Sequence, residues 1–272
     1  PEDTKTAWEL MMADRGGLYL DSKPGVYTEV IELDFASLFP SIIATRNISP
    51  ETLNCACCQP STDELGPSSY LPLEVNLASS ELRRRHIEER IGTGLFPITN
   101  SWALPVPGLS SHTCGRVHGF LGRVVAPIIE RRRQLKQQTV SKGDTIDKQQ
   151  NALKWLLVTC FGYTGYKNAR FGRIEAHEAI CAWAREILLQ TIAMAESSGW
   201  TVLHAIVDCV WLHREDVSRQ EKQVLAKDFA QRVTQEIGIP LEYEDIYHFI
   251  GFLPSRMHGS GSLTKYWAYG EK

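Results

Sequence analysis

One acidic residue stands inside an otherwise apolar stretch, HAIVDCVWL, at residues 204–212. The apolar pattern predicts a buried β-strand, with Asp208 in the middle of the stretch. Burying an unpaired carboxylate is costly, so Asp208 should face a cation or a metal ion. The stretch therefore marks a candidate metal site.

A second candidate ligand is Asp34, in the segment ELDFASLFPSII at residues 32–43. The alternation before it predicts a strand over residues 26–35 that turns into a short helix. A carboxylate and backbone N–H groups at such a turn can hold a metal ion and a phosphate together. Asp34 and Asp208 on neighbouring strands could converge on Mg²⁺, as phosphoryl transfer needs. The alternative is that Asp34 only caps the following helix.

Basic residues on two expected helices could contact a phosphate. Arg132 and Lys136 are four residues apart and share one helix face, and Lys154 shares a face of the next helix with Val158 and Phe161. Arginine supplies paired donors and lysine a point charge, and both suit a triphosphate. The alternative is that the run ERRRQLK at residues 130–136 is simply a solvated face.

Cysteines gather at both ends of an irregular segment, in NCACC at residues 54–58 and HTC at residues 112–114. The candidate zinc ligands are Cys55, Cys57, Cys58, His112 and Cys114. A tetrahedral Zn²⁺ site built from them would tie the segment down. The spacing C-x-C-C is not that of a standard zinc knuckle, so free or packed thiols are the alternative.

The composition limits the class of protein. Hydrophobic residues make up 43% and charged residues 22% of 272 residues, as in ordinary soluble globular proteins. The formal net charge of −3 excludes a wholly basic surface that coats nucleic acid but allows a local basic groove. The odd count of seven cysteines argues against a disulfide framework.

Neither a membrane span nor a signal peptide is expected, because no apolar stretch is long enough without prolines and glycines. The chain starts with proline, so we expect part of a longer or processed protein. The expected elements are a strand, an irregular segment, three helices, strands, a helix and further strands. This order predicts an α+β fold in which a helical subdomain interrupts the sheet.

Four segments, in order, resemble the motifs of family B DNA polymerases. DFASLFPSII resembles motif A, usually D-x-x-S-L-Y-P-S-I, and KWLLVTCFGYTGYKNARFG resembles motif B, K-x-x-x-N-x-x-Y-G. HAIVDCVWL stands where motif C, Y-G-D-T-D-S, is expected. GFLPS and LTKYWAYG resemble the segment that leads into the K-x-Y motif. Together these segments span most of residues 26–270.

The resemblance implies a polymerase palm, an antiparallel sheet with packed helices, into which helical fingers are inserted. The implied parts are palm at residues 1–48, a possible zinc-stabilised insert at 49–115, fingers at 116–175 and palm at 176–272. No segment resembles the exonuclease acids, and the sequence stops where a thumb would begin. The resemblance therefore implies further polymerase domains, or a partner subunit, that supply these functions.

The resemblance also implies an activity: template-directed addition of dNTPs to a primer 3′-OH in DNA replication or repair. Two Mg²⁺ or Mn²⁺ ions would be held by Asp34 and Asp208. The implied nucleotide-binding residues are Ser37, Leu38, Phe39, Arg132, Lys136, Lys154 and Phe161. The implied contacts to primer-template DNA are Gly162, Tyr163, Lys265 and Tyr266. Phe39 replaces the usual tyrosine but keeps the ring that excludes a ribose 2′-OH.

Several residues depart from the family pattern. Ile206 replaces the first acid of motif C, Cys209 its serine, and Val158 and Phe161 replace the asparagine and tyrosine of motif B. These losses predict attenuated catalysis. The pattern is most similar to a divergent second prokaryotic or archaeal branch of the family. That resemblance implies a cytoplasmic, nucleoid-associated protein. Glu242 or Glu244 could supply a further carboxylate. The alternatives are a catalytically inactive DNA-binding or scaffold module and a zinc-stabilised interaction domain.

Overall fold

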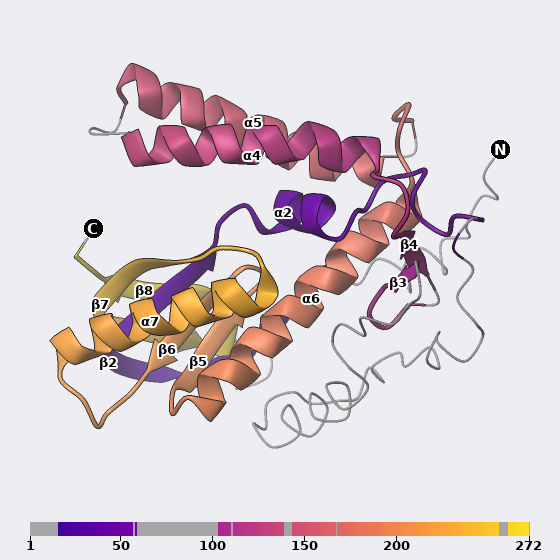
Figure 1. Ribbon diagram of the computed structural model, residues 1–272. Coiled ribbons are helices and arrows are strands. Elements are labelled where there is room, and N and C mark those ends of the chain that lie inside the picture. The colour runs from indigo at the N-terminus through magenta and orange to yellow at the C-terminus, as the bar shows by residue number, and fades with distance from the viewer. Residues whose placement is uncertain are drawn as a thin grey trace. The chain divides into compact units, whose positions relative to one another are not determined.

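The computed structural model describes residues 16–56, 58, 103–109, 111–138, 143–166, 168–255 and 261–271 (Figure 1). Among these residues, one compact unit contains residue 16 and residues 37–183, and we call it the helical unit. The other contains residues 17–36 and 184–271, and we call it the sheet unit. The division falls inside one long helix, after Trp183.

The sheet unit is built on six antiparallel strands in the order β1-β5-β6-β2-β7-β8. The strands are β1 (Tyr19–Leu20), β2 (Gly25–Phe35), β5 (Thr201–Ile206), β6 (Cys209–His213), β7 (Leu241–Pro254) and β8 (Gly261–Tyr269). β2 pairs with β6 on one side and with β7 on the other. The end of β2 is therefore enclosed by strands on both sides.

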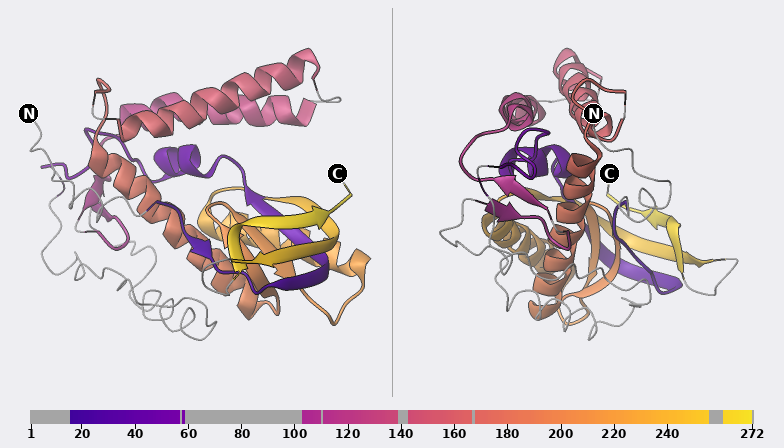
Figure 2. Two further views of the ribbon diagram at one scale, coloured as in Figure 1. Left: turned by 180° about the vertical axis from the view of Figure 1, so that it is seen from behind. Right: turned by 90° about the vertical axis from the view of Figure 1, so that its right-hand side faces the viewer.

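The alternation of β2 sends its acids and its apolar residues to opposite faces, since successive side chains of a strand alternate. Ile31, Leu33 and Phe35 are buried, whereas Glu32 and Asp34 are half-buried. Helix α7 (Arg219–Ile237) packs against β2 and β7 (Figure 2). The acids of β2 therefore lie on the sheet face opposite Ile31, Leu33 and Phe35.

The helical unit is led by two helices, α4 (Phe120–Gln138) and α5 (Thr145–Thr164), which run side by side (Figure 1, Figure 2). Helix α2 (Leu38–Thr45) packs against both. The side chain of Asp144 accepts a hydrogen bond from the Asp147 backbone N–H and caps α5. The unit also contains a small sheet of β3 (Ala103–Pro105) and β4 (His112–Cys114), and the first turns of α6 (Ile174–Ser197).

The predicted α+β class is confirmed, with an antiparallel sheet and packed helices. The strand expected at residues 26–35 is present as β2. The stretch 204–212, expected as one buried strand, instead contains the end of β5 and most of β6, with Asp208 in the turn between them, because the chain reverses there into an antiparallel pair. The structure groups α2 with the helices, and the predicted domain boundaries at residues 48, 115 and 175 stay predictions. Among the residues described, no helix combines the length and apolar character needed to cross a membrane.

Candidate active site

The end of β2 and the turn between β5 and β6 bring two carboxylates and a thiol together in the sheet unit. Strand register places Asp34 opposite Cys209, the first residue of β6. The Phe35 N–H donates to the Asp208 carbonyl oxygen at 2.9 Å, which fixes the turn against β2. One ligand atom each of Asp34, Asp208 and Cys209 lies within 4.8 Å of the others. This cluster is the carboxylate centre.

The turn that presents Asp208 is strained. Val207 has φ 53°, a left-handed conformation that a β-branched residue rarely adopts. The Asp208 N–H donates to the Ile206 carbonyl oxygen at 2.6 Å, and the Val207 N–H donates to the Leu18 carbonyl oxygen at 2.9 Å. Backbone contacts on both sides therefore hold Asp208 in place.

The negative charges of the carboxylate centre repel one another. Burial and the charge of Asp208 raise the pKa of the Asp34 carboxyl to about 7, and Glu244 and Glu32 add to the increase. Burial and the charge of Asp34 also raise the pKa of the Cys209 thiol, which donates to Asp34 Oδ1 at 3.1 Å. A bound cation would relieve this repulsion, so the donor set fits a divalent metal ion.

An apolar side chain, Ile206, occupies the position where motif C usually has its first acid. Ile206 pairs with Cys209 in register and packs against the buried cluster that contains Trp211. Of the two further acids considered from the sequence, Glu242 lies opposite Asp34 in register, while Glu244 is the one whose charge acts on the pKa of Asp34. The extra residue Glu244 forms a bulge in β7 opposite Glu32 and Leu33 of β2, and this bulge shifts the pairing.

In the helical unit, α4 reaches the start of α2. Ser37 precedes α2 with φ 54°, and its Oγ accepts a hydrogen bond from Arg132 Nη1 at 2.7 Å. Lys136 and Lys154 are exposed on α4 and α5. Leu38 as a whole is 1% exposed, so this predicted nucleotide-binding residue is buried in the structure.

Three rings from three helices form a stack that the sequence analysis missed. Phe39 of α2 stacks on Phe161 of α5, with centroids 4.3 Å apart, and Phe161 stacks on His177 of α6 at 4.6 Å. His177 Nδ1 is 3.3 Å from the Thr164 hydroxyl. No sequence motif marked His177, because its role depends on packing between separate helices.

The residues predicted to contact DNA fall in both units. In the helical unit, Gly162 is exposed and Tyr163 lines a cavity of about 430 Å³ whose wall includes Phe171. In the sheet unit, Lys265 is exposed on β8. The Tyr266 ring packs near Trp211 and Phe252, and burial together with the charge of Glu32 raises its pKa.

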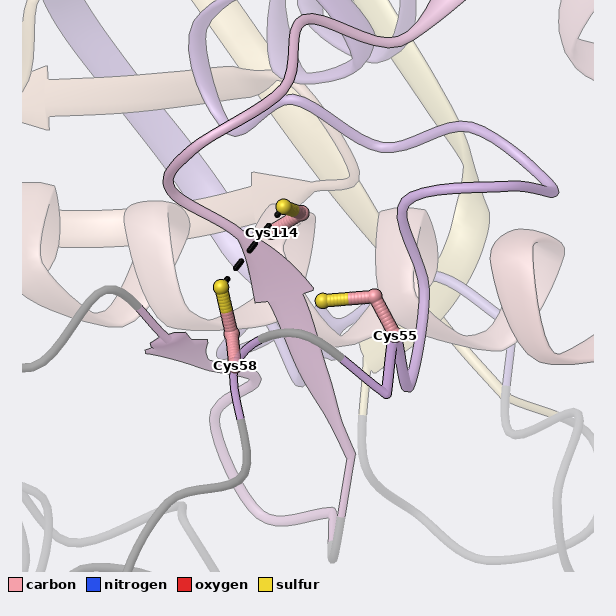
Figure 3. Close-up of side chains that lie close together, drawn as sticks. All are labelled: Cys55, Cys58 and Cys114. Carbon is pink, nitrogen blue, oxygen red and sulfur yellow. Dashed lines mark hydrogen bonds between the residues drawn. The ribbon is translucent and has the colours of Figure 1, made fainter.

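The cysteines form a second cluster, within the helical unit. The sulfur atoms of Cys55, Cys58 and Cys114 all lie within 4.8 Å of one another (Figure 3). His112 Nε2 is 3.7 Å from Cys55 Sγ. Cys57, the remaining predicted ligand, lies outside the described residues. We call Cys55, Cys58, Cys114 and His112 the cysteine cluster.

Comparisons with known proteins connect this arrangement to one family. A family model described as DNA polymerase family B matches residues 4–249. DNA polymerase 2 of Saccharolobus solfataricus is 31% identical over 249 residues, covering 91% of this chain and 29% of the relative. DNA polymerase 1 of Pyrococcus abyssi is 25% identical over 254 residues, covering 91% of this chain and 28% of the relative.

A solved structure shares the fold. The family B DNA polymerase from Pyrobaculum calidifontis superposes with a TM-score of 0.60 at 20% identity, covering 99% of this chain and 30% of that one. The chain therefore spans less than a third of the length of these relatives.

Proposed function

Because the chain belongs to DNA polymerase family B, we propose that it provides the palm and fingers of a template-directed DNA polymerase. The protein would add dNTPs to a primer 3′-OH. The observation that carries this proposal is the convergence of Asp34, Asp208 and Cys209 within 4.8 Å at the end of the central strand. Paired carboxylates at such a position suit the metal-assisted transfer of a nucleotidyl group.

Asp34 and Asp208 would hold two Mg²⁺ or Mn²⁺ ions. When bound, such ions lower the pKa of the attacking hydroxyl and neutralise charge that develops on the phosphate. The thiol of Cys209 donates to Asp34 Oδ1 and orients that carboxylate. Because the pKa of Asp34 is raised to about 7, protons would compete with metal ions below neutral pH.

The helical unit would supply the nucleotide contacts. Arg132, oriented by its hydrogen bond to Ser37 Oγ, would bind the triphosphate together with Lys136 and Lys154. Backbone N–H groups at the start of α2 are further donors. The ring of Phe39 would exclude a ribose 2′-OH, since Phe161 supports it by stacking.

Primer-template DNA would be contacted by residues of both units. Gly162 and Tyr163 would lie near the templating base, and Lys265 and Tyr266 would touch the primer-terminal duplex. The remaining domains of a longer polymerase, or a partner subunit, would add backbone contacts, which dominate affinity for DNA. The corresponding role would be DNA replication or repair at a cytoplasmic nucleoid. Ile206 would reduce the rate of primer extension.

The test is primer extension by the full-length protein on a primed template with Mg²⁺ or Mn²⁺. Asp34→Asn and Asp208→Asn should each lower the rate by about a thousandfold or more, because metal ions supply several kcal/mol of transition-state stabilisation. Asp216→Asn is the matched control, since Asp216 is exposed and ion-paired with Arg214 at 2.7 Å. Activity that survives both active-site substitutions would overturn the metal assignment.

Binding to primed DNA, measured in parallel, distinguishes an active polymerase from an inactive DNA-binding module. A folded wild-type protein that does not extend primers but binds DNA equally well with and without EDTA would be an inactive binding module.

A further inference from the structure

The cysteine cluster has the dimensions of a metal site. Cys58 Sγ and Cys114 Sγ are 3.7 Å apart, and Cys55 Sγ lies within 4.8 Å of both (Figure 3). Tetrahedral zinc with Zn–S bonds of about 2.3 Å places its sulfur ligands about 3.8 Å apart. A disulfide would need about 2.05 Å, so Cys58 and Cys114 are not joined by one.

The backbone brings the four side chains together from two segments far apart in sequence. Leu53 forms a β-bridge with Thr113, and the Asn54 N–H donates to the His112 carbonyl oxygen at 2.8 Å. His112 and Cys114 are two residues apart on β4 and therefore share one face. Cys55 and Cys58 then add the C-x-x-C spacing common in zinc sites.

One hydrogen bond from outside the cluster reaches a candidate ligand sulfur. The Arg116 backbone N–H donates to Cys114 Sγ at 3.4 Å. Such outer hydrogen bonds to ligand sulfur orient the ligand and offset its negative charge. Cys58 and Cys114 are 5% and 1% exposed, so a bound ion would be shielded from water.

We propose that Cys55, Cys58, Cys114 and His112 bind one structural Zn²⁺ ion. Three thiols each release a proton to the solvent, and their sulfur lone pairs form three bonds to the ion. The fourth bond would come from His112 Nε2, which lies 3.7 Å from Cys55 Sγ and 3.3 Å from the Cys55 carbonyl oxygen, so the ring must turn toward the three sulfur atoms to reach the ion. Zinc undergoes no redox change, so no oxidant or reductant is required.

The ion would hold the start of α4 in place. The segment before Cys55 caps this helix: the Gly119 N–H donates to Asn47 Oδ1 at 2.8 Å and the Phe120 N–H to Glu51 Oε1 at 2.6 Å. Asn47 Nδ2 also donates to the Cys114 carbonyl oxygen at 2.6 Å. Zinc would therefore stabilise the segment that positions α4, the helix that carries Arg132.

Metal analysis of the full-length protein tests the proposal. Mass spectrometry of the purified protein should find about one zinc ion fewer per chain after Cys58→Ser or Cys114→Ser than in wild type. Cys160→Ser, on α5, should keep the full content. Cys57→Ser should also keep it, whereas a loss there with retention in Cys58→Ser would overturn the ligand assignment.

Cobalt provides a measurement that does not require a variant to fold. Wild-type protein exchanged with Co²⁺ should show thiolate-to-metal absorption, with an intensity set by about three thiolate ligands. Zinc-free wild-type protein whose Cys58 and Cys114 are joined by a disulfide would overturn the proposal.

Loss of an outer hydrogen-bond partner typically weakens metal affinity about 10–100-fold. Because His112 would bind the ion directly, His112→Ala should weaken zinc affinity by at least that much. Unchanged affinity would remove His112 from the ligand set. Zinc content is also independent of the polymerase proposal, because Asp34→Asn protein should retain zinc even though it extends no primer.

Discussion

The carboxylate centre and the cysteine cluster are both candidate metal sites, but the fold holds them in different ways. Asp34 and Cys209 are fixed by the register of two long strands, and Asp208 by a strained turn beside them. The cysteine cluster joins a loop to a three-residue strand, across 56 residues of sequence between Cys58 and Cys114. The first site is fixed by strand pairing, whereas the second joins two segments 56 positions apart in sequence.

The two clusters also differ in what the absence of an ion costs. Acids crowd the carboxylate centre, and burial together with their repulsion raises the pKa of Asp34 to about 7. Thiols are neutral when protonated, so the cysteine cluster lacks comparable repulsion. An ion at the first site should therefore mainly enable chemistry, and an ion at the second should mainly stabilise the fold.

The largest expected effect separates these two roles. Cys114→Ser should lower the melting temperature of the protein by about 10 °C or more, because loss of a structural metal removes several kcal/mol. Asp208→Asn should not lower it, because the substitution removes a repulsive charge. Differential scanning calorimetry measures both variants. Equal losses of stability would mean that the clusters do not differ in role.

A second prediction concerns the missing acid of the carboxylate centre. Ile206→Asp should raise the rate of primer extension by about tenfold, equivalent to 1.4 kcal/mol, because it restores a carboxylate beside Cys209. Ile206→Asn, which adds a polar group without charge, is the control and should give no increase. If both variants match wild type, the lost acid does not limit the reaction.

A third prediction uses the raised pKa of Asp34. In the folded protein Asp34 keeps its proton up to about pH 7, whereas in the unfolded chain it loses the proton near the ordinary aspartate pKa of 3.8. The stability of the folded protein therefore falls as pH rises between these two values. Without Mg²⁺ or Mn²⁺, Asp34→Asn should raise the melting temperature at pH 8 by about 2–4 °C or more. At pH 3 the gain should vanish, since both states of wild type are then largely protonated.

Asp216→Asn again provides the contrast for this pH experiment. The Arg214 guanidinium lowers the pKa of the Asp216 carboxyl, which is the opposite direction. Its substitution should give no gain in melting temperature at pH 8, and an equal gain there would indicate a general effect of net charge.

The smallest expected effect concerns the strained turn. Val207→Gly should stabilise the protein by about 0.5 kcal/mol, since glycine adopts a positive φ without strain but loses more chain entropy on folding. The melting temperature should then rise by about 1–2 °C. Activity should fall in the same variant if strain helps to fix Asp208. A lower melting temperature would show that Val207 contributes more through packing than it costs through φ.

Strand patterns indicated where Asp34 and Asp208 lie in the sheet, whereas the cysteine spacing indicated only part of the cysteine cluster. Alternation in β2 located Asp34, and the apolar run around Asp208 indicated an adjacent strand. The spacing C-x-C-C could not show which thiols face Cys114, because this depends on a turn and on bridges to β4. The influence of Glu244 on Asp34 was equally hidden, since a bulge in β7 at Glu244 shifts the register against β2.

Because Phe39, Phe161 and His177 stack, the residue tolerated at each of these positions depends on the other two. Each ring comes from a different helix, and Phe161 is in contact on both of its faces. A change in ring size at any one position would leave a gap or a clash at its neighbour. Over evolutionary time these three positions should therefore covary.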